Sequence, residues 1–100
     1  MKLSEMNLTM MESAVLSALP KECFYEMGFD SCVWVDCFLD TVRAETGIDS
    51  KQARALLVSL EKKDFISIVG DGRDKGIELR QNGKDFLLQM NLVNEQGYAI

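Results

Sequence analysis

The sequence predicts an α+β fold that is mostly α: a three-helix core, a two-stranded β-hairpin and a C-terminal helix. Two observations predict it. Apolar residues recur with a helical period between about residue 10 and residue 62, and the pattern then changes to the alternation that is typical of strands. With 100 residues, 47% hydrophobic and 27% charged, the chain is long enough for one packed core. We expect a single domain over residues 1–94 and a frayed C-terminal tail over residues 95–100.

The first helix is expected from about residue 10 to residue 19. Thr9 and Glu12 have the spacing of a capping box, in which each side chain satisfies a backbone N–H at the start of a helix. Pro20 ends this helix because it has no N–H to continue the hydrogen-bond ladder. The face expected to be buried carries Met11, Ala14, Val15 and Ala18. Residues 21–30, with several aromatic side chains, predict a short turn or strand.

A second helix is expected over about residues 31–46. Its apolar side chains recur on one helix face, and they are Trp34, Val35, Phe38, Leu39 and Val42. We interpret Trp34, with Phe38 one turn later, as part of the core. Gly47 then supplies a residue that can take a positive φ where the helix ends.

A third helix is expected to begin only about three residues after the second ends. Asp49 and Gln52 repeat the spacing of a capping box. The apolar stripe that follows consists of Ala53, Leu56, Leu57 and Leu60. The charged residues 61–64 then form a solvated end.

Two strands and a last helix follow. Residues 65–69 are rich in β-branched and aromatic side chains, and residues 77–80 alternate apolar with polar side chains. Between them, residues 70–76 contain three glycines, which suit a hairpin tip. The last helix is expected over about residues 82–91, with Phe86, Leu87 and Met90 on its apolar face.

The order of these elements resembles that of a winged helix-turn-helix domain. Residues 46–66, which read TGIDSKQARALLVSLEKKDFI, are similar to the turn and recognition helix of MarR-like bacterial transcriptional regulators. Those families commonly have a glycine and an aliphatic residue in the turn, a polar cap, a leucine pair, and then Leu-Glu-x-x-Gly before two hydrophobic residues. Residues 79–87, which read LRQNGKDFL, are similar to the segment after the wing, commonly Leu-Thr-x-x-Gly-x-x-x-Leu.

The resemblance covers roughly residues 8–90 and departs from the family pattern at two positions. Asp64 stands where the second glycine is usual, and Arg80 stands where a helix-capping threonine is usual. The resemblance implies a DNA-binding transcriptional regulator of prokaryotic or phage type, and it identifies no subfamily. Winged-helix domains also serve as protein adaptors, so the alternative is a protein–protein interaction module without DNA binding, which uses the acidic first half of the chain or the recognition face as its interface.

The net charge of −5 by itself argues against nucleic acid as a partner, because phosphate binding depends on Lys and Arg. The charge is unevenly distributed along the chain. Residues 1–42 carry a net charge of −5, residues 43–84 carry +2 and residues 85–100 carry −2. Most of the basic side chains therefore lie in the segment that resembles the recognition helix and the wing.

In a winged-helix domain the recognition helix enters the major groove, and the wing contacts the DNA backbone or the minor groove. The resemblance places this helix at about residues 50–62 and the wing at residues 70–76. Arg54 can bind guanine, Gln52 can bind adenine, and an exposed apolar side chain can meet a thymine methyl. Lysines and arginines elsewhere on the helix and wing are expected on phosphates. The candidate DNA-binding residues are Ser50, Lys51, Gln52, Arg54, Ala55, Val58, Lys62, Arg73 and Lys75.

Other interpretations stay open beside this one. The basic face of residues 50–62 is also typical of a solvent-exposed helix that binds no partner. Asp36, Asp40 and Glu45 would weaken DNA binding if they faced phosphate, so we expect them on the far side, where a protein partner can use them. The segment between Leu87 and Val93 is more apolar than one terminal helix needs against its own core, which predicts a homodimer or a partner contact.

The sequence gives no indication of an enzymatic function. Histidine, the usual partner of a catalytic nucleophile, is absent. Cys23, Cys32 and Cys37 lack the spacing of a zinc site, and we expect them to be reduced and mostly buried. The glycines of residues 70–76 are spaced one residue too far apart for a nucleotide-binding loop, and a strand follows them. We therefore expect no metal and no cofactor.

No apolar run in the sequence approaches the length that spans a bilayer. The N-terminal residues also lack the uninterrupted apolar stretch of a signal peptide. We expect a cytoplasmic protein that makes no membrane contact.

Overall fold

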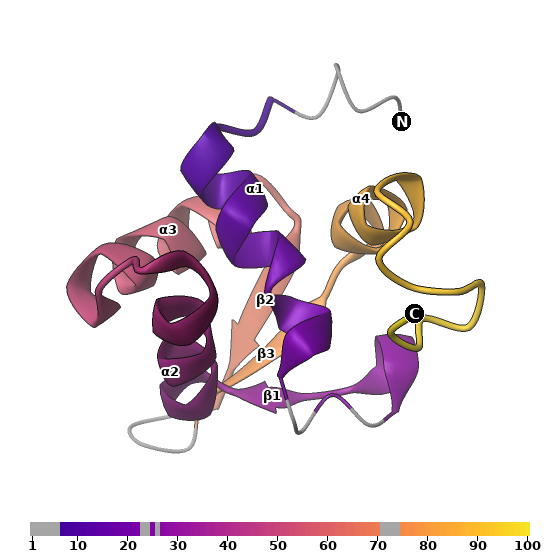
Figure 1. Cartoon of the computed structure of the whole chain (residues 1–100), viewed down its shortest axis with the longest axis horizontal. Helices are drawn as coiled ribbons and strands as arrows, with labels where there is room; N and C mark the ends of the chain where they lie inside the picture. Colours follow the sequence, from indigo (N-terminus) through magenta and orange to yellow (C-terminus); the bar gives the residue numbers. More distant parts are fainter. Residues whose placement is uncertain (1–6, 23–24, 26, 71–74) are drawn as a thin grey trace.

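Residues 7–22, 25, 27–70 and 75–100 are described by the computed structural model (Figure 1). Within these residues the chain forms four α-helices and a three-stranded antiparallel sheet, so the fold is α+β and mostly helical, as the sequence predicts. The α-helices are α1 (Met10–Ser17), α2 (Val35–Thr46), α3 (Ser50–Lys62) and α4 (Gln81–Gln89). The strands are β1 (Val33–Trp34), β2 (Ile66–Val69) and β3 (Gly76–Leu79), and two short 3-10 helices, η2 (Leu19–Lys21) and η3 (Gly28–Asp30), precede β1.

The capping box at the start of α1 is present, as predicted. The backbone N–H of Glu12 donates to Thr9 Oγ1 at 3.1 Å, and the N–H of Thr9 donates to Glu12 Oε1 at 2.9 Å. The helix ends at Ser17, and Pro20 lies in η2. The predicted buried face is partly wrong, because the Met11 side chain is exposed and the side chains of Glu12, Val15 and Leu16 are buried.

The strand β1 is an element that the helical pattern of residues 31–46 does not predict. Val33 pairs with Ile77 and Trp34 pairs with Gly76, so α2 begins only at Val35. Strand alternation turns Val33 into the core and Trp34 outward, where it is 47% exposed. The interpretation of Trp34 as a core residue is therefore wrong, whereas Phe38 is buried as expected.

The connection between α2 and α3 matches its prediction. Gly47 has a φ of 78° at the end of α2, and residues 47–49 separate the two helices. Asp49 caps α3, because its Oδ1 accepts the N–H of Gln52 at 2.8 Å. The predicted capping box is only half formed, because the Gln52 side chain donates to the Met11 Sδ instead. Of the predicted apolar stripe, Ala53, Leu57 and Leu60 are buried and Leu56 is half-buried.

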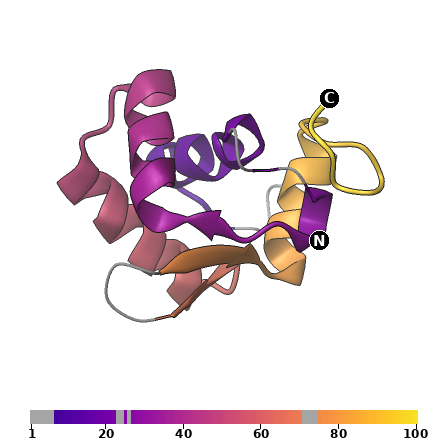
Figure 2. The ribbon, with the colours of Figure 1, turned by 90° about the horizontal axis from the view of Figure 1, so that it is seen from below.

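The β2–β3 hairpin also lies where the sequence predicts it, with Ile66 paired to Leu79 and Val69 paired to Gly76. The predicted hairpin tip, residues 70–76, falls partly outside the described residues, because residues 71–74 are not described. β3 is the central strand and β1 and β2 are the edges. Figure 2 shows the strands along one side of the molecule, with α2 and α3 toward one end and α4 at the other.

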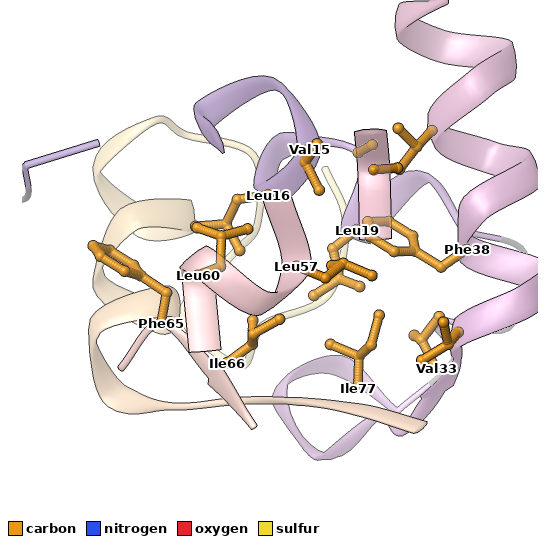
Figure 3. Close-up of a cluster of buried hydrophobic side chains, with 14 of the residues drawn as sticks. Val15, Leu16, Leu19, Val33, Phe38, Leu57, Leu60, Phe65, Ile66 and Ile77 are labelled. Carbon is orange, nitrogen blue, oxygen red and sulfur yellow. The ribbon is translucent and has the colours of Figure 1, made fainter. Parts of the chain in front are cut away.

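The hydrophobic core lies between the helices and the inner face of the sheet. Figure 3 shows ten labelled side chains from α1, η2, α2, α3, the strands and the residue that precedes β2, each at most 2% exposed: Val15, Leu16, Leu19, Val33, Phe38, Leu57, Leu60, Phe65, Ile66 and Ile77. Burying one such Leu or Phe side chain stabilises a fold by about 1.5–3 kcal/mol. α3 is thus anchored through Leu57 and Leu60, and its opposite face points to solvent.

The backbone geometry explains the residue type at two positions where the family pattern has glycine, Asp64 and Gly83. Asp64, where the pattern has glycine, adopts a φ of 67°, which is a left-handed conformation. Its carboxylate lies 3.2 Å from the Arg80 Nε, so the two departures from the pattern pair with each other. At Gly83 a Cβ atom would overlap the carbonyl oxygen of Phe65, so the approach of α4 to the hairpin requires glycine there.

The C-terminal segment packs on the core of the same chain. α4 ends at Gln89, two residues before the predicted end, and Leu87 and Val93 are buried. Met90, expected on the apolar face, is 42% exposed. Much of the apolar surface that predicts a homodimer contact is therefore covered by the chain's own core. Where the sequence predicts a frayed tail, the N–H of Asn94 donates to the carbonyl of Tyr98 at 2.8 Å and closes a turn.

The cysteines differ in exposure from their prediction. Cys32 is exposed and Cys37 is half-buried, and both are free thiols. The expectation of mostly buried thiols is wrong for Cys32, because it precedes β1 on the same outer face as Trp34. Cys23 lies outside the described residues. Among the described helices, none has both the length and the apolar character needed to cross a membrane.

Candidate nucleic-acid interface

The outward face of α3 is the surface that the sequence predicts for DNA contact. Its buried stripe fixes the orientation of the helix, so the remaining positions point away from the core. Of the nine predicted residues, Arg73 lies outside the described residues and Ser50 is half-buried. The exposed members are Lys51, Gln52, Arg54, Ala55, Val58, Lys62 and Lys75.

The hairpin meets α3 at an open depression of about 110 Å³. Arg54 and Val58 of α3 and Lys75 of the hairpin line it together with the apolar side chains of Val35, Leu57 and Ile68. The backbone N–H of Val35 donates to the carbonyl of Lys75 at 3.0 Å, which joins the start of α2 to the residue that precedes β3. The fold therefore brings one predicted base-reading residue and one predicted phosphate-binding residue to the same place.

The other candidates are spread along α3. Lys51 and Lys62 lie at its two ends. Gln52 faces α1, because its Nε2 donates to the Met11 Sδ at 3.4 Å. The Gln52 side chain would have to break this hydrogen bond before it could contact adenine.

One acidic residue of α2, Asp36, lies nearer to this surface than expected. The Asp36 Oδ1 is 3.3 Å from the Arg54 Nη2, and both side chains are well exposed. The expectation that Asp36 lies on the far side is wrong, because the first turn of α2 packs beside α3. Glu45 pairs instead with Lys21 at 3.2 Å, and Asp40 is exposed.

A buried charged network behind α3 was not predicted. Glu12, which is 2% exposed, accepts hydrogen bonds from the Ser59 Oγ at 2.5 Å and from the Lys63 Nζ at 2.7 Å. Burial raises the pKa of Glu12, but the hydrogen bonds from Lys63, Ser59 and Thr9 outweigh burial and lower the pKa to about 2. The capping-box spacing signals the role of Glu12 at the start of α1, and nothing in the sequence signals its pairing with α3.

The pKa values of two other side chains, Tyr25 and Cys32, are raised. Burial raises the pKa of Tyr25 to about 12, and its buried hydroxyl has no hydrogen-bond partner among the described residues. Burial of the sulfur and the charge of Glu78 raise the pKa of the Cys32 thiol, which disfavours the reactive thiolate. In the part of the chain that the structure describes, no three His, Cys, Asp or Glu residues are grouped as metal ligands.

Comparisons with models of protein families, with curated proteins and with solved structures find no match for this chain. The surface formed by α3 and the start of β3 is then the structural feature that indicates a function. That surface carries exposed lysine and arginine side chains and the exposed Val58, and the described residues contain no grouped metal ligands.

Proposed function

We propose that this protein is a winged helix-turn-helix regulator that binds double-stranded DNA, with α3 as the recognition helix and the β2–β3 hairpin as the wing. The observation that carries the proposal is the depression that Arg54 and Val58 share with Lys75. A helix in the major groove would carry the tip end of the adjoining hairpin, where Lys75 lies, to the flanking DNA backbone. Lys75 then meets phosphate while Arg54 faces the base edges.

The backbone supports the resemblance to MarR-like regulators at three positions. Gly47 takes a positive φ in a three-residue turn, Asp64 takes a positive φ after α3, and Gly83 permits a close approach of α4 to Phe65. These are the positions at which the family pattern has glycine. The chain therefore has glycine at two of the positions where the backbone needs a positive φ or a close approach. At the third position it has Asp64, and aspartate tolerates a positive φ.

Each part of the surface has a proposed role. Lys51, Lys62 and Lys75 bind phosphates, and these contacts set the salt dependence of binding. Arg54 can donate two hydrogen bonds to guanine, and Ala55 or Val58 can contact a thymine methyl. The overall charge of −5 keeps non-specific binding weak, so low ionic strength is needed to detect it.

The test is fluorescence anisotropy of a labelled mixed-sequence duplex titrated with the whole chain over a range of salt concentrations. Lys51→Ala and Lys75→Ala should each weaken binding and reduce the salt slope by about one unit. Lys21→Ala is the matched control, because Lys21 is exposed on η2 and pairs with Glu45. An absence of binding at low salt, or equal losses in all three variants, would refute the proposal.

A protein adaptor is the second candidate function, and the exposure of Trp34 favours it. Trp34 and Cys32 lie on the outer face of the sheet, and a large exposed aromatic side chain is frequent where proteins bind one another. An adaptor would bind no duplex at low salt. Trp34→Ala would then reduce binding to its protein partner, whereas Lys75→Ala would have little effect.

A further inference from the structure

One side chain at the proposed interface, Asp36, carries a negative charge, which opposes DNA binding. Asp36 lies in the first turn of α2, and its carboxylate is 3.3 Å from the Arg54 guanidinium. It cancels one of the two positive charges that line the depression between α3 and the hairpin. A surface that only had to attract phosphate would gain from a neutral residue at this position.

We propose that Asp36 is a specificity-determining residue, which orients Arg54 toward a guanine edge and discourages contact with the phosphate backbone. This inference rests on the proposed function. Arg54 has five N–H donors, and the bond to Asp36 uses a single Nη2. The remaining donors are enough for two parallel bonds to the N7 and O6 atoms of guanine.

Charge explains why the carboxylate discriminates between the two kinds of contact. A phosphate that approaches Arg54 also meets the negative charge of Asp36, and the two anions repel each other. The guanine edge is uncharged, so it approaches Arg54 without this repulsion. Asp36 therefore weakens binding to DNA that offers only its backbone more than it weakens binding to a site that offers guanine.

The position of the pair fits this role. The N–H of Val35 is bonded to the carbonyl of Lys75, so the residue that precedes Asp36 is fixed to the tip end of the hairpin, at the start of β3. Arg54 and Asp36 are 60% and 66% exposed, so a ligand can reach both side chains. An exposed pair of this kind is weak enough to rearrange around a bound base.

The test measures anisotropy with a labelled mixed-sequence duplex for the wild type, Asp36→Asn, Asp40→Asn, Arg54→Gln and the Asp36→Asn/Arg54→Gln double variant. Asp36→Asn removes the charge and keeps the side-chain shape. Asp40→Asn makes the same change in net charge one turn later on α2, where the carboxylate is exposed. Asp36→Asn should bind about fivefold more tightly and raise the salt slope by about one unit.

The gain should depend on Arg54, so it should disappear when Arg54→Gln is already present. Selection of binding sites from a random duplex pool should give a weaker guanine preference for Asp36→Asn than for the wild type. Equal gains in Asp36→Asn and Asp40→Asn, or a gain that persists without Arg54, would overturn the inference while leaving DNA binding intact. A lack of duplex binding by every variant at low salt would instead overturn the proposed function.

Discussion

The Lys63 ammonium lies 2.7 Å from the Glu12 carboxylate, which is 2% exposed and joins α1 to α3. The same carboxylate accepts the Ser59 hydroxyl and the Thr9 N–H, so each of its oxygens is bonded. A buried carboxylate in a folded protein needs such partners because the loss of water is costly. The pair therefore fixes how α3, the proposed recognition helix, is placed against α1.

Lys63→Ala should destabilise the fold because it leaves the buried carboxylate of Glu12 without its cation. We expect a loss of about 3 kcal/mol in the free energy of unfolding, measured by urea denaturation. Lys62→Ala is the matched control, because Lys62 is the preceding residue of α3 and is exposed. It should change the free energy of unfolding by less than about 0.5 kcal/mol. Similar losses in both variants would contradict this account of the pair.

The low pKa of Glu12 predicts an acid-sensitive fold. The pKa is about 2 in the folded chain against an ordinary value of 4.5, so the unfolded chain takes up the proton first as the pH falls. The stabilisation, roughly 3 kcal/mol, is complete above about pH 4.5 and is lost as the pH falls from there toward 2. Denaturation midpoints measured across this window should fall less steeply in Glu12→Gln than in the wild type. Parallel curves would show that Glu12 is not the titrating group.

Glycine is expected to be required at Gly83 for space and at Gly47 for conformation. A Cβ at Gly83 would overlap the carbonyl oxygen of Phe65, so Gly83→Ala should cost about 1–3 kcal/mol despite the helical position. A Cβ at Gly47 meets no atom within 4 Å, and only its φ of 78° opposes it. Gly47→Ala should therefore cost about 1 kcal/mol. A Gly83→Ala variant as stable as the wild type in thermal denaturation would contradict the packing of α4.

Trp34 is the single tryptophan of the chain, and its fluorescence reports on β1. Since the side chain is 47% exposed, its emission in the folded protein should be readily quenched by acrylamide. Trp34→Ala should cost less than about 1 kcal/mol, whereas Phe38→Ala, in the core, should cost about 3–5 kcal/mol. A tryptophan that acrylamide hardly quenches, or equal losses of stability in the two variants, would contradict the exposed position of Trp34. Either result would favour the continuous helix that the sequence pattern predicts for residues 31–46.

The candidate site was partly predictable because a helix repeats its geometry locally. Once Ala53, Leu57 and Leu60 define the buried stripe, the exposure of Arg54 and Val58 follows from the helical period. The partners of these side chains do not follow from it. Asp36 reaches Arg54 from another helix, and Lys75 reaches the depression from a hairpin.

Features that depend on neighbours along the chain could be predicted from the residues alone: the caps at Thr9 and Asp49, the positive φ at Gly47, and the change of period that separates α3 from the hairpin. These rest on hydrogen bonds and sterics spanning a few residues. Three outcomes became visible only in the folded chain: β1 forms, Trp34 faces outward, and Glu12 is buried against Lys63. Those outcomes depend on contacts between distant segments, whose free energies override local preference and leave no periodic signal in the sequence.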